Sequence, residues 1–168
     1  MYTLFYRKIF FILAISLVVG MGCRVWEICE VNPNTDEYIQ VKKLIKCPNT
    51  FRRYEGQAIK VWGYVEFVNI FDPREYPNED GGRILLKEKA TTDTGNGIFI
   101  YLPEDQDNSW FFDILQHEAE LQPQATNPKL KLYAEGMLYG FDMPTNFSNT
   151  RGHYVAVDDV RQHIHISH

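Results

Sequence analysis

Apolar and polar side chains alternate across residues 57–67, and this period of two predicts a long β-strand. Gly63 interrupts the alternation near its middle. A glycine inside a strong strand pattern usually marks a bulge or a bend, which a sheet needs if it is to close into a small barrel. The side chains expected to face inward are Ile59, Val61, Val65 and Phe67.

Residues 129–139 repeat this pattern, with Gly136 in the place of Gly63. Their apolar positions alternate with charged and aromatic positions, as expected for a strand with one buried face. The two stretches together predict a matched pair of bent strands. The inward side chains expected from the second stretch are Leu130, Leu132, Ala134 and Leu138.

Three shorter strands and two helices complete the prediction. The strands are residues 83–88, 97–102 and 153–160. One helix is expected from the capping residues 32–35 to the stop at Cys47-Pro48, and a second is expected to begin at residues 107–109, with Asp105 and Asp107 as capping groups. Residues 69–82 and 140–152 are predicted to be long loops.

This order of a helix, three strands, a helix and two strands resembles the OB-fold, a five-stranded, partly open Greek-key barrel. The resemblance is carried by residues 54–65 (YEGQAIKVWGYV), 131–138 (KLYAEGML) and 154–160 (YVAVDDV), and it covers residues 45–160. These strands are similar to those of small bacterial OB domains of the anticodon-binding type, including exported ones. The resemblance implies an all-β barrel with flanking helices that binds a ligand and carries no catalytic residue.

In OB-folds, ligands meet the outer face of the middle strands and the loops after the first and fourth strands. Aromatic rings at such positions can stack on sugars, bases or partner side chains. The resemblance therefore implies ligand-binding candidates on the strands and in the two long loops. They are Trp62, Tyr64, Phe99 and Tyr101 on the strands, and Phe71, Tyr76, Phe141 and Phe147 in the loops.

The N-terminus has the pattern of an export signal, with Arg7-Lys8 followed by an apolar run from Ile9 to Val19. Small residues before Cys23 resemble a bacterial lipobox, which implies cleavage after Gly22 and a lipid such as palmitate on Cys23. Gly20 stands where that pattern prefers leucine, so an ordinary cleaved signal and an uncleaved anchor remain as alternatives. All three alternatives place the domain outside the cytoplasm, in the cell envelope on its periplasmic or extracellular face.

Removal of residues 1–22 takes Arg7 and Lys8 with it and leaves 15 basic against 22 acidic residues, a net charge of −7. Binding of a phosphate backbone depends on lysine and arginine, so this balance argues against a nucleic-acid partner. With 168 residues, the chain is long enough for one domain. The expected organisation is a signal peptide (1–22), an arm with a helix (23–48), the OB-fold (49–160) and a histidine-containing tail (161–168).

Cys29 and Cys47 remain after Cys23 and form a possible disulfide between the arm and the domain, with two independent thiols as the alternative. His163, His165 and His168 have a spacing compatible with a metal, but no acidic or cysteine partner lies nearby in sequence, and we expect no metal site or cofactor. Nucleophile-elbow and phosphate-loop patterns do not occur in the sequence.

We therefore expect a non-enzymatic lipoprotein of the envelope, held to the membrane through Cys23, whose OB-fold binds a protein, peptide or glycan. The alternative hypotheses are an OB-fold that binds single-stranded nucleic acid and a metal-dependent protein that uses the histidine tail.

Overall fold

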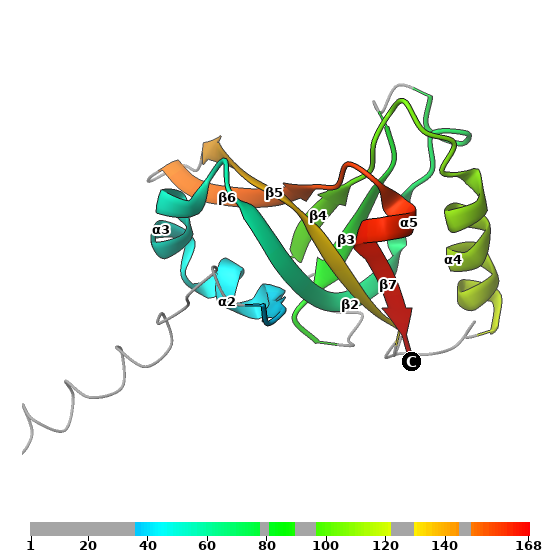
Figure 1. Ribbon diagram of the computed structural model, residues 1–168, viewed down its shortest axis with the longest axis horizontal. Coiled ribbons are helices and arrows are strands. Elements are labelled where there is room, and N and C mark those ends of the chain that lie inside the picture. Colours follow the sequence, from blue (N-terminus) through cyan, green and yellow to red (C-terminus); the bar gives the residue numbers. More distant parts are fainter. Residues whose placement is uncertain (1–35, 78–80, 90–96, 122–129, 145–148) are drawn as a thin grey trace, which may run out of the picture. The chain divides into compact units, whose positions relative to one another are not determined.

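Five strands, β2 to β6, form a closed barrel, and the short strands β1 and β7 extend it (Figure 1). The computed structural model describes residues 36–77, 81–89, 97–121, 130–144 and 149–168. Residues 1–22, Cys23, Cys29 and Phe147 lie outside this part of the chain. The strands are β1 (Ile39–Gln40), β2 (Ala58–Phe71), β3 (Arg83–Lys87), β4 (Gly97–Tyr101), β5 (Lys131–Pro144), β6 (Asn149–Ala156) and β7 (Ile164–Ser167).

The barrel strands pair in the order β2, β3, β4, β6, β5, and β5 returns to pair with β2. All of these pairs are antiparallel except β4 with β6, which are parallel. Helix α4 (Ser109–Leu121) connects β4 to β5, the third and fourth strands of the barrel. This is the OB-fold topology, so the predicted fold class is confirmed, with two edge strands beyond the five expected.

Each of the two long strands changes its pairing partner one residue after its glycine. Tyr64, which follows Gly63, is the residue of β2 that pairs with both β5 and β3. Met137, which follows Gly136, is the residue of β5 that pairs with both β2 and β6. Gly63 and Gly136 therefore stand where the strands pass from one side of the barrel to the other.

Because β2 and β5 change partners, each has a stretch of edge that the five-stranded barrel does not cover. β1 pairs in parallel with Val61 and Trp62 of β2, and β7 pairs with residues 131–134 of β5. Residues 39–40 are thus a strand where the sequence pattern predicted part of a helix. The predicted C-terminal tail likewise includes α5 (Val160–His163) and β7, which form an ordered edge of the barrel.

The N-terminal helix begins later than predicted, at Val41, and ends at Lys46, next to the predicted stop at Cys47-Pro48; a separate short helix begins at Pro48. Its apolar face is formed by Val41 and Leu44 in α2 (Val41–Lys46), and Phe51 is buried in α3 (Pro48–Phe51), which is followed by the 3₁₀ turn η1 (Arg52–Tyr54). Pro48 explains the division, because proline is tolerated in a first helical turn but not in a helix interior. Tyr38, which shares the helical spacing of Val41 and Leu44 in the sequence, lies before the helix begins.

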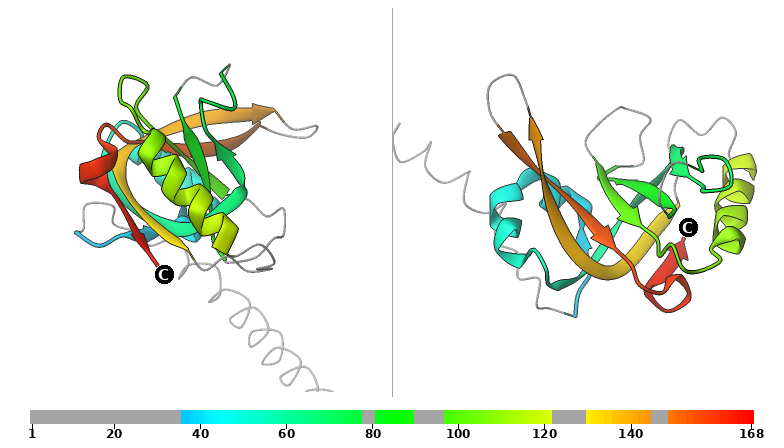
Figure 2. Two further views of the ribbon diagram at one scale, coloured as in Figure 1. Left: turned by 90° about the vertical axis from the view of Figure 1, so that its right-hand side faces the viewer. Right: turned by 90° about the horizontal axis from the view of Figure 1, so that it is seen from above.

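Helix α4 lies across one end of the barrel, as the left view of Figure 2 shows. It buries Phe111, Phe112 and Leu115, whereas Ile114, which the sequence pattern places in the same apolar stripe, is 42% exposed. The Asp107 carboxylate accepts a hydrogen bond from the Ser109 N–H at 3.0 Å, in the capping role expected of it. The turn before α4 is fixed by Asn108, a buried residue that donates to the Pro103 carbonyl at 2.8 Å.

The inward residues predicted for both long strands are buried, with one exception. Phe67 is only half-buried, because the β2–β3 register shifts between Val65 and Ile70 and turns this part of the strand. Both strands also run further than predicted. Phe71 ends β2 and Phe141 lies within β5, although both were expected in loops.

Candidate binding groove

The strand register brings outward-facing aromatic residues of four strands together. Two neighbouring rows cross the sheet. The first row is Phe71 on β2, Arg83 on β3 and Tyr101 on β4. The second row is Phe99 on β4, Tyr154 on β6 and Tyr139 on β5.

The aromatic rings of these two rows, together with the ring of Tyr76, lie next to one another in a continuous series. We call this series of six rings the aromatic row. Consecutive ring centroids are 4.9 to 6.3 Å apart, the separation at which aromatic pairs attract each other. Tyr154 is its central member, since its ring also lies 6.3 Å from that of Phe141. In order, the aromatic row is Tyr76, Phe71, Phe99, Tyr101, Tyr154 and Tyr139.

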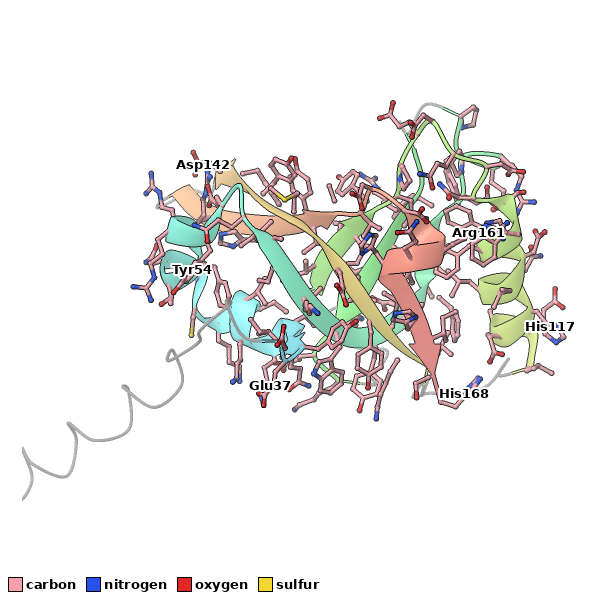
Figure 3. The ribbon with its side chains drawn as sticks, in the orientation of Figure 1. Glu37, Tyr54, His117, Asp142, Arg161 and His168 are labelled. Atoms are coloured by element: carbon pink, nitrogen blue, oxygen red, sulfur yellow. The ribbon has the colours of Figure 1, made fainter. Side chains whose placement is uncertain are left out.

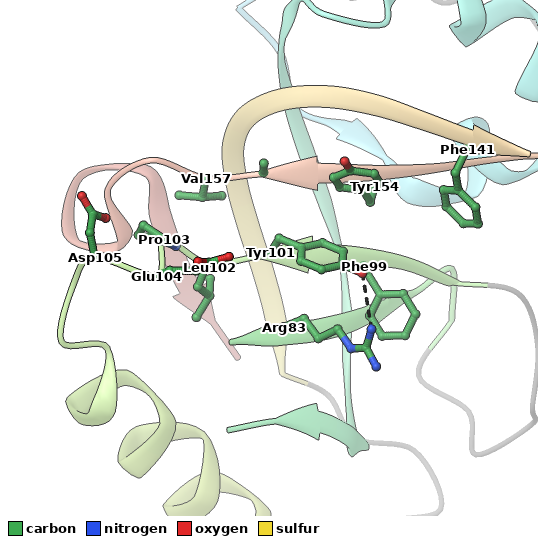
Figure 4. Close-up of a pocket in the computed structure, with 11 residues that line it drawn as sticks. Arg83, Phe99, Tyr101, Leu102, Pro103, Glu104, Asp105, Phe141, Tyr154 and Val157 are labelled. Carbon is green, nitrogen blue, oxygen red and sulfur yellow. Dashed lines mark hydrogen bonds between the residues drawn. The ribbon is translucent and has the colours of Figure 1, made fainter. Parts of the chain in front are cut away.

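A groove of about 870 Å³ lies along this surface (Figure 4). Phe99, Tyr101, Phe141 and Tyr154 line it together with apolar residues such as Val157. Its size is within the range of sites that hold a small molecule or a short stretch of polymer. The barrel therefore presents a preformed groove with aromatic, apolar and charged side chains, on the face and beside the loops where OB-folds meet their ligands.

Arg83 provides the basic group of the groove. Its guanidinium carbon lies 4.3 Å from the ring centroid of Phe71 and 5.0 Å from that of Phe99, which are cation–π distances. Its Nη1 donates a long hydrogen bond of 3.4 Å to the Tyr101 hydroxyl, drawn in Figure 4. These contacts hold the positive charge beside the rings.

Two carboxylates, those of Glu104 and Asp105, supply the negative charge of the groove. Glu104 and Asp105 follow β4, line the groove with Pro103, and are both exposed. Figure 4 shows these residues at one end of the lining and Phe99 and Phe141 toward the other. The groove therefore has an acidic end and an aromatic end.

Ion pairs fix the loop that follows β2 and carries Tyr76. Arg74 binds the Asp72 carboxylate, with Nη2 at 2.6 Å, and also reaches Asp113 of α4 at 2.8 Å. Burial opposes ionisation of Asp72, but hydrogen bonds from the Arg74 side chain and backbone N–H outweigh it and keep the pKa of this carboxyl below its usual value. The Asp72 carbonyl accepts from the Tyr76 N–H at 2.9 Å. The loop is thereby tied to α4, and Tyr76 reaches Phe71.

A second polar cluster fixes the β5–β6 hairpin that presents Phe141. Glu55 accepts hydrogen bonds from Arg151, and Arg151 Nη1 donates to Asp142 at 2.9 Å; Figure 3 shows Asp142 at this hairpin. The buried His153 lies 3.2 Å from Glu55. The Arg151 hydrogen bonds lower the pKa of Glu55, and burial lowers that of His153 despite the neighbouring carboxylate.

Trp62 and Tyr64 belong to a different aromatic cluster. The Trp62 ring stacks on Tyr133, with centroids 6.1 Å apart, and Tyr38 meets Tyr133 edge-on at 5.2 Å. Lys131 Nζ lies 5.8 Å from the Trp62 ring and 6.0 Å from the Tyr64 ring. This Trp62 cluster does not line the groove described above.

The hydroxyl of Tyr38 ties the N-terminal segment to this cluster. It donates to Glu135 at 2.6 Å, and burial together with this bond raises the pKa of Tyr38 to about 12. The same hydrogen bond lowers the pKa of Glu135. Lys60 Nζ also lies 3.5 Å from Glu135. These contacts show how the strand β1 segment is held on the barrel.

The predicted ligand-binding residues are thus divided between two surfaces. Phe71, Tyr76, Phe99, Tyr101 and Phe141 gather around the groove, whereas Trp62 and Tyr64 lie in the Trp62 cluster. Sequence reasoning missed Arg83, Tyr139 and Tyr154. The alternation of Tyr154 with the inward Val155 and Val157 marked it as outward, but only the register reveals its neighbours.

The three C-terminal histidines do not converge within the described residues. His163 lies 3.6 Å from Asp158 and His168 lies 3.7 Å from Glu118, while His165 is exposed on β7. Among the residues that the structure describes, no group of three metal-ligating side chains occurs. Cys47 is buried and disulfide-bonded. Its predicted partner, Cys29, lies outside the described residues.

No helix within the described ranges is both long enough and apolar enough to cross a membrane.

Comparison with known proteins gives structural neighbours only. No family model matches the chain, and no curated protein matches it. Solved structures similar to it include the OBody AM3L09 bound to hen egg-white lysozyme (12% identity, TM-score 0.39, covering 68% of this chain and 84% of that one). Another is the Plasmodium falciparum SSB in complex with ssDNA (14% identity, TM-score 0.34, covering 66% and 91%). The assignment of the fold rests on the strand order described above.

Proposed function

We propose that this chain is a non-enzymatic binding protein of the bacterial cell envelope, tethered through a lipid on Cys23, whose groove holds a segment of a protein, a peptide or a glycan. The observation that carries the proposal is the aromatic row, in which six rings from four strands and a loop adjoin a preformed groove. Rigid aromatic side chains supply contact area at little cost in conformational entropy.

The surroundings of the groove support a role in binding. Ion pairs hold Arg74, two residues before Tyr76, and Asp142, next to Phe141, so the described residues on both flanks of the groove are held in place before a ligand arrives. Preorganisation of this kind raises affinity because fewer groups must be ordered on binding. The sequence patterns of a catalytic nucleophile do not occur in this chain.

Capture of partners tests the function of the groove. Full-length protein is expressed in a bacterial envelope, crosslinked and purified beside the Tyr154→Ala and Tyr133→Ala variants. Tyr133 is the matched control, because it is a tyrosine of the Trp62 cluster. We expect Tyr154→Ala alone to lose the captured partner. Equal capture by all three proteins would contradict the proposal.

The tether is tested by intact-mass measurement of membrane-extracted protein. Cleavage before Cys23 with an added diacylglycerol mass is the expected result, and a Cys23→Ser variant should lose both changes. Full-length cytoplasmic protein with an unmodified Cys23 would contradict the proposed tether. It would not bear on the proposed role of the groove.

Binding of single-stranded nucleic acid is the second candidate function. The aromatic row favours it, because bases stack on such rings with about 1–3 kcal/mol each. The charge of the groove does not favour it, since Glu104 and Asp105 outnumber Arg83 along the lining. Salt-sensitive binding of oligothymidylate that Tyr154→Ala abolishes would establish this candidate in place of the first.

A further inference from the structure

We propose that the occupant of the groove is an extended, proline-rich peptide segment with an arginine or lysine at the Glu104–Asp105 end. This inference rests on the proposed binding function of the groove and names the class of its partner. It is drawn from the distribution of polar groups, charges and rings along the groove.

The charged side chains of the lining are Arg83, Glu104 and Asp105, and its other side chains are aromatic or apolar. Tyr101, Tyr154, Ala156 and Val157 offer rings, small apolar side chains and two phenol hydroxyls. A ligand that covers this floor with many unpaired donors or acceptors would bear a large desolvation cost. A proline lacks the backbone N–H, so a proline-rich segment brings fewer polar groups that need partners.

The rings suit a polyproline helix in shape as well. Such a helix is preformed and has no internal hydrogen bonds, and aromatic-lined grooves recognise it through its pyrrolidine faces. Tyr101 and Tyr154, with centroids 4.9 Å apart and planes inclined by 58°, present two walls of different orientation. Their hydroxyls are suitable donors to the exposed carbonyls of the segment.

The charges give the segment a direction. Glu104 and Asp105 are exposed at one end, and neither is ion-paired within the described part of the chain. Arg83 lies further along the lining, against Phe99. A basic residue of the ligand is attracted to the two carboxylates and repelled by Arg83, so it is placed at the acidic end.

The same features disfavour the other ligand classes. A phosphate backbone would pass the two carboxylates with a single arginine in compensation. A glycan also stacks on aromatic rings, but its hydroxyls need a dense set of partners, which a lining of mostly aromatic and apolar side chains does not supply. A proline-rich basic segment is the class that satisfies both the rings and the charges.

Fluorescence anisotropy tests this inference with full-length protein extracted in detergent. The probe is a fluorescein-labelled peptide in which a run of prolines ends in two arginines. Comparison peptides are the same proline run ending in two glutamates and a Gly-Ser run ending in two arginines. We expect the first peptide to bind most tightly, with Kd at least about tenfold lower than for either comparison peptide.

Variants locate the binding. Tyr154→Ala should weaken binding of the proline–arginine peptide about tenfold, and Glu104→Gln/Asp105→Asn should remove its preference for arginine over glutamate. Tyr133→Ala should bind the peptide as the wild type does. A Gly-Ser peptide that binds as tightly as the proline peptide would overturn the inference.

Unlabelled oligothymidylate and an N-acetylglucosamine oligomer serve as competitors. If only one of these binds, and Tyr154→Ala abolishes that binding, the groove functions but the peptide class is wrong. If Tyr154→Ala leaves the partners captured in the envelope unchanged, the proposed function of the groove itself fails. The two failures are therefore distinguishable.

Discussion

Tyr139 and Tyr154 lie face to face across the β5–β6 pair, with ring planes 19° apart and centroids 5.3 Å apart. Tyr154 also meets Tyr101 of β4, the strand with which β6 pairs in parallel. One tyrosine therefore joins the hairpin to the middle of the barrel face. This arrangement makes Tyr154 the most informative position for mutagenesis in the groove.

Tyr154→Ala is expected to weaken partner binding more than it weakens the fold. The side chain is only half-buried and its neighbours Tyr101, Tyr139 and Phe141 remain, so we expect the free energy of unfolding to fall by about 1 kcal/mol. Affinity for the captured partner should fall about tenfold. Urea denaturation and binding titrations measure the two effects, and Tyr154→Phe, which keeps the ring, should retain most of the affinity. A large loss of stability without a loss of affinity would assign Tyr154 to the fold alone.

Gly63 is expected to accept no larger side chain. A Cβ at this position would lie 2.8 Å from Val41 Cγ2 and 3.0 Å from the Lys87 carbonyl oxygen, so α2 and β3 both approach it closely. We expect Gly63→Val to destabilise the protein by about 3 kcal/mol through overpacking. Ala58→Val, at an exposed position of the same strand, is the control. A urea midpoint for Gly63→Val equal to that of the wild type would show that the barrel closes differently.

The barrel could be predicted from the sequence because its main determinants are local. The alternation around Gly63 and Gly136 identified both long strands, and their glycines stand beside the residues where the pairing changes. The apolar stripe of α4 was equally local. These patterns report burial, and burial determines which face of each element turns inward.

The groove could be predicted only in part, because it depends on register between distant strands. Trp62 and Phe99 both occupy outward positions, yet β2 changes partner at Tyr64, and this leaves Trp62 beside Tyr133 of β5 and Phe99 beside Phe71. The partnership of Tyr101 with Tyr154 requires the parallel pairing of β4 and β6, which no local pattern encodes. The strands β1 and β7 were not predicted, because they too depend on pairing between distant segments. They pair with edges of β2 and β5 that exist only after the barrel has closed.

Acidification is expected to destabilise the protein through His153 and Glu55. The pKa of His153 is lowered from 6.5 by burial, so the unfolded chain binds a proton first as the pH falls. The contribution of neutral His153 to the free energy of unfolding is complete above pH 6.5, and it is lost as the pH falls toward the lower pKa of His153 in the folded protein. Glu55, whose pKa lies below 4.5 in the folded protein, also becomes a source of lost stability when the pH falls below 4.5.

Urea midpoints measured across this pH range test the prediction. The wild type should lose stability steadily below pH 6.5, and His153→Gln should flatten the part of the curve between pH 6.5 and 4.5. His165→Gln, a change at an exposed histidine of β7, is the control for the loss of a histidine. A His153→Gln curve parallel to that of the wild type would exclude His153 as the source of the pH dependence.

Removal of residues 164–168 is expected to destabilise the barrel because it uncovers β5, not because it removes histidines. Ile164 is buried, and β7 covers the edge of β5 from Lys131 to Ala134. Loss of this burial and pairing should lower the free energy of unfolding by about 2 kcal/mol, and the uncovered strand edge should promote association. Urea denaturation and size-exclusion chromatography measure the two effects. A full-length His165→Ala/His168→Ala variant keeps β7 and should behave as the wild type does; if it reproduces the truncation, the histidines themselves are responsible and a role for them in metal binding gains support.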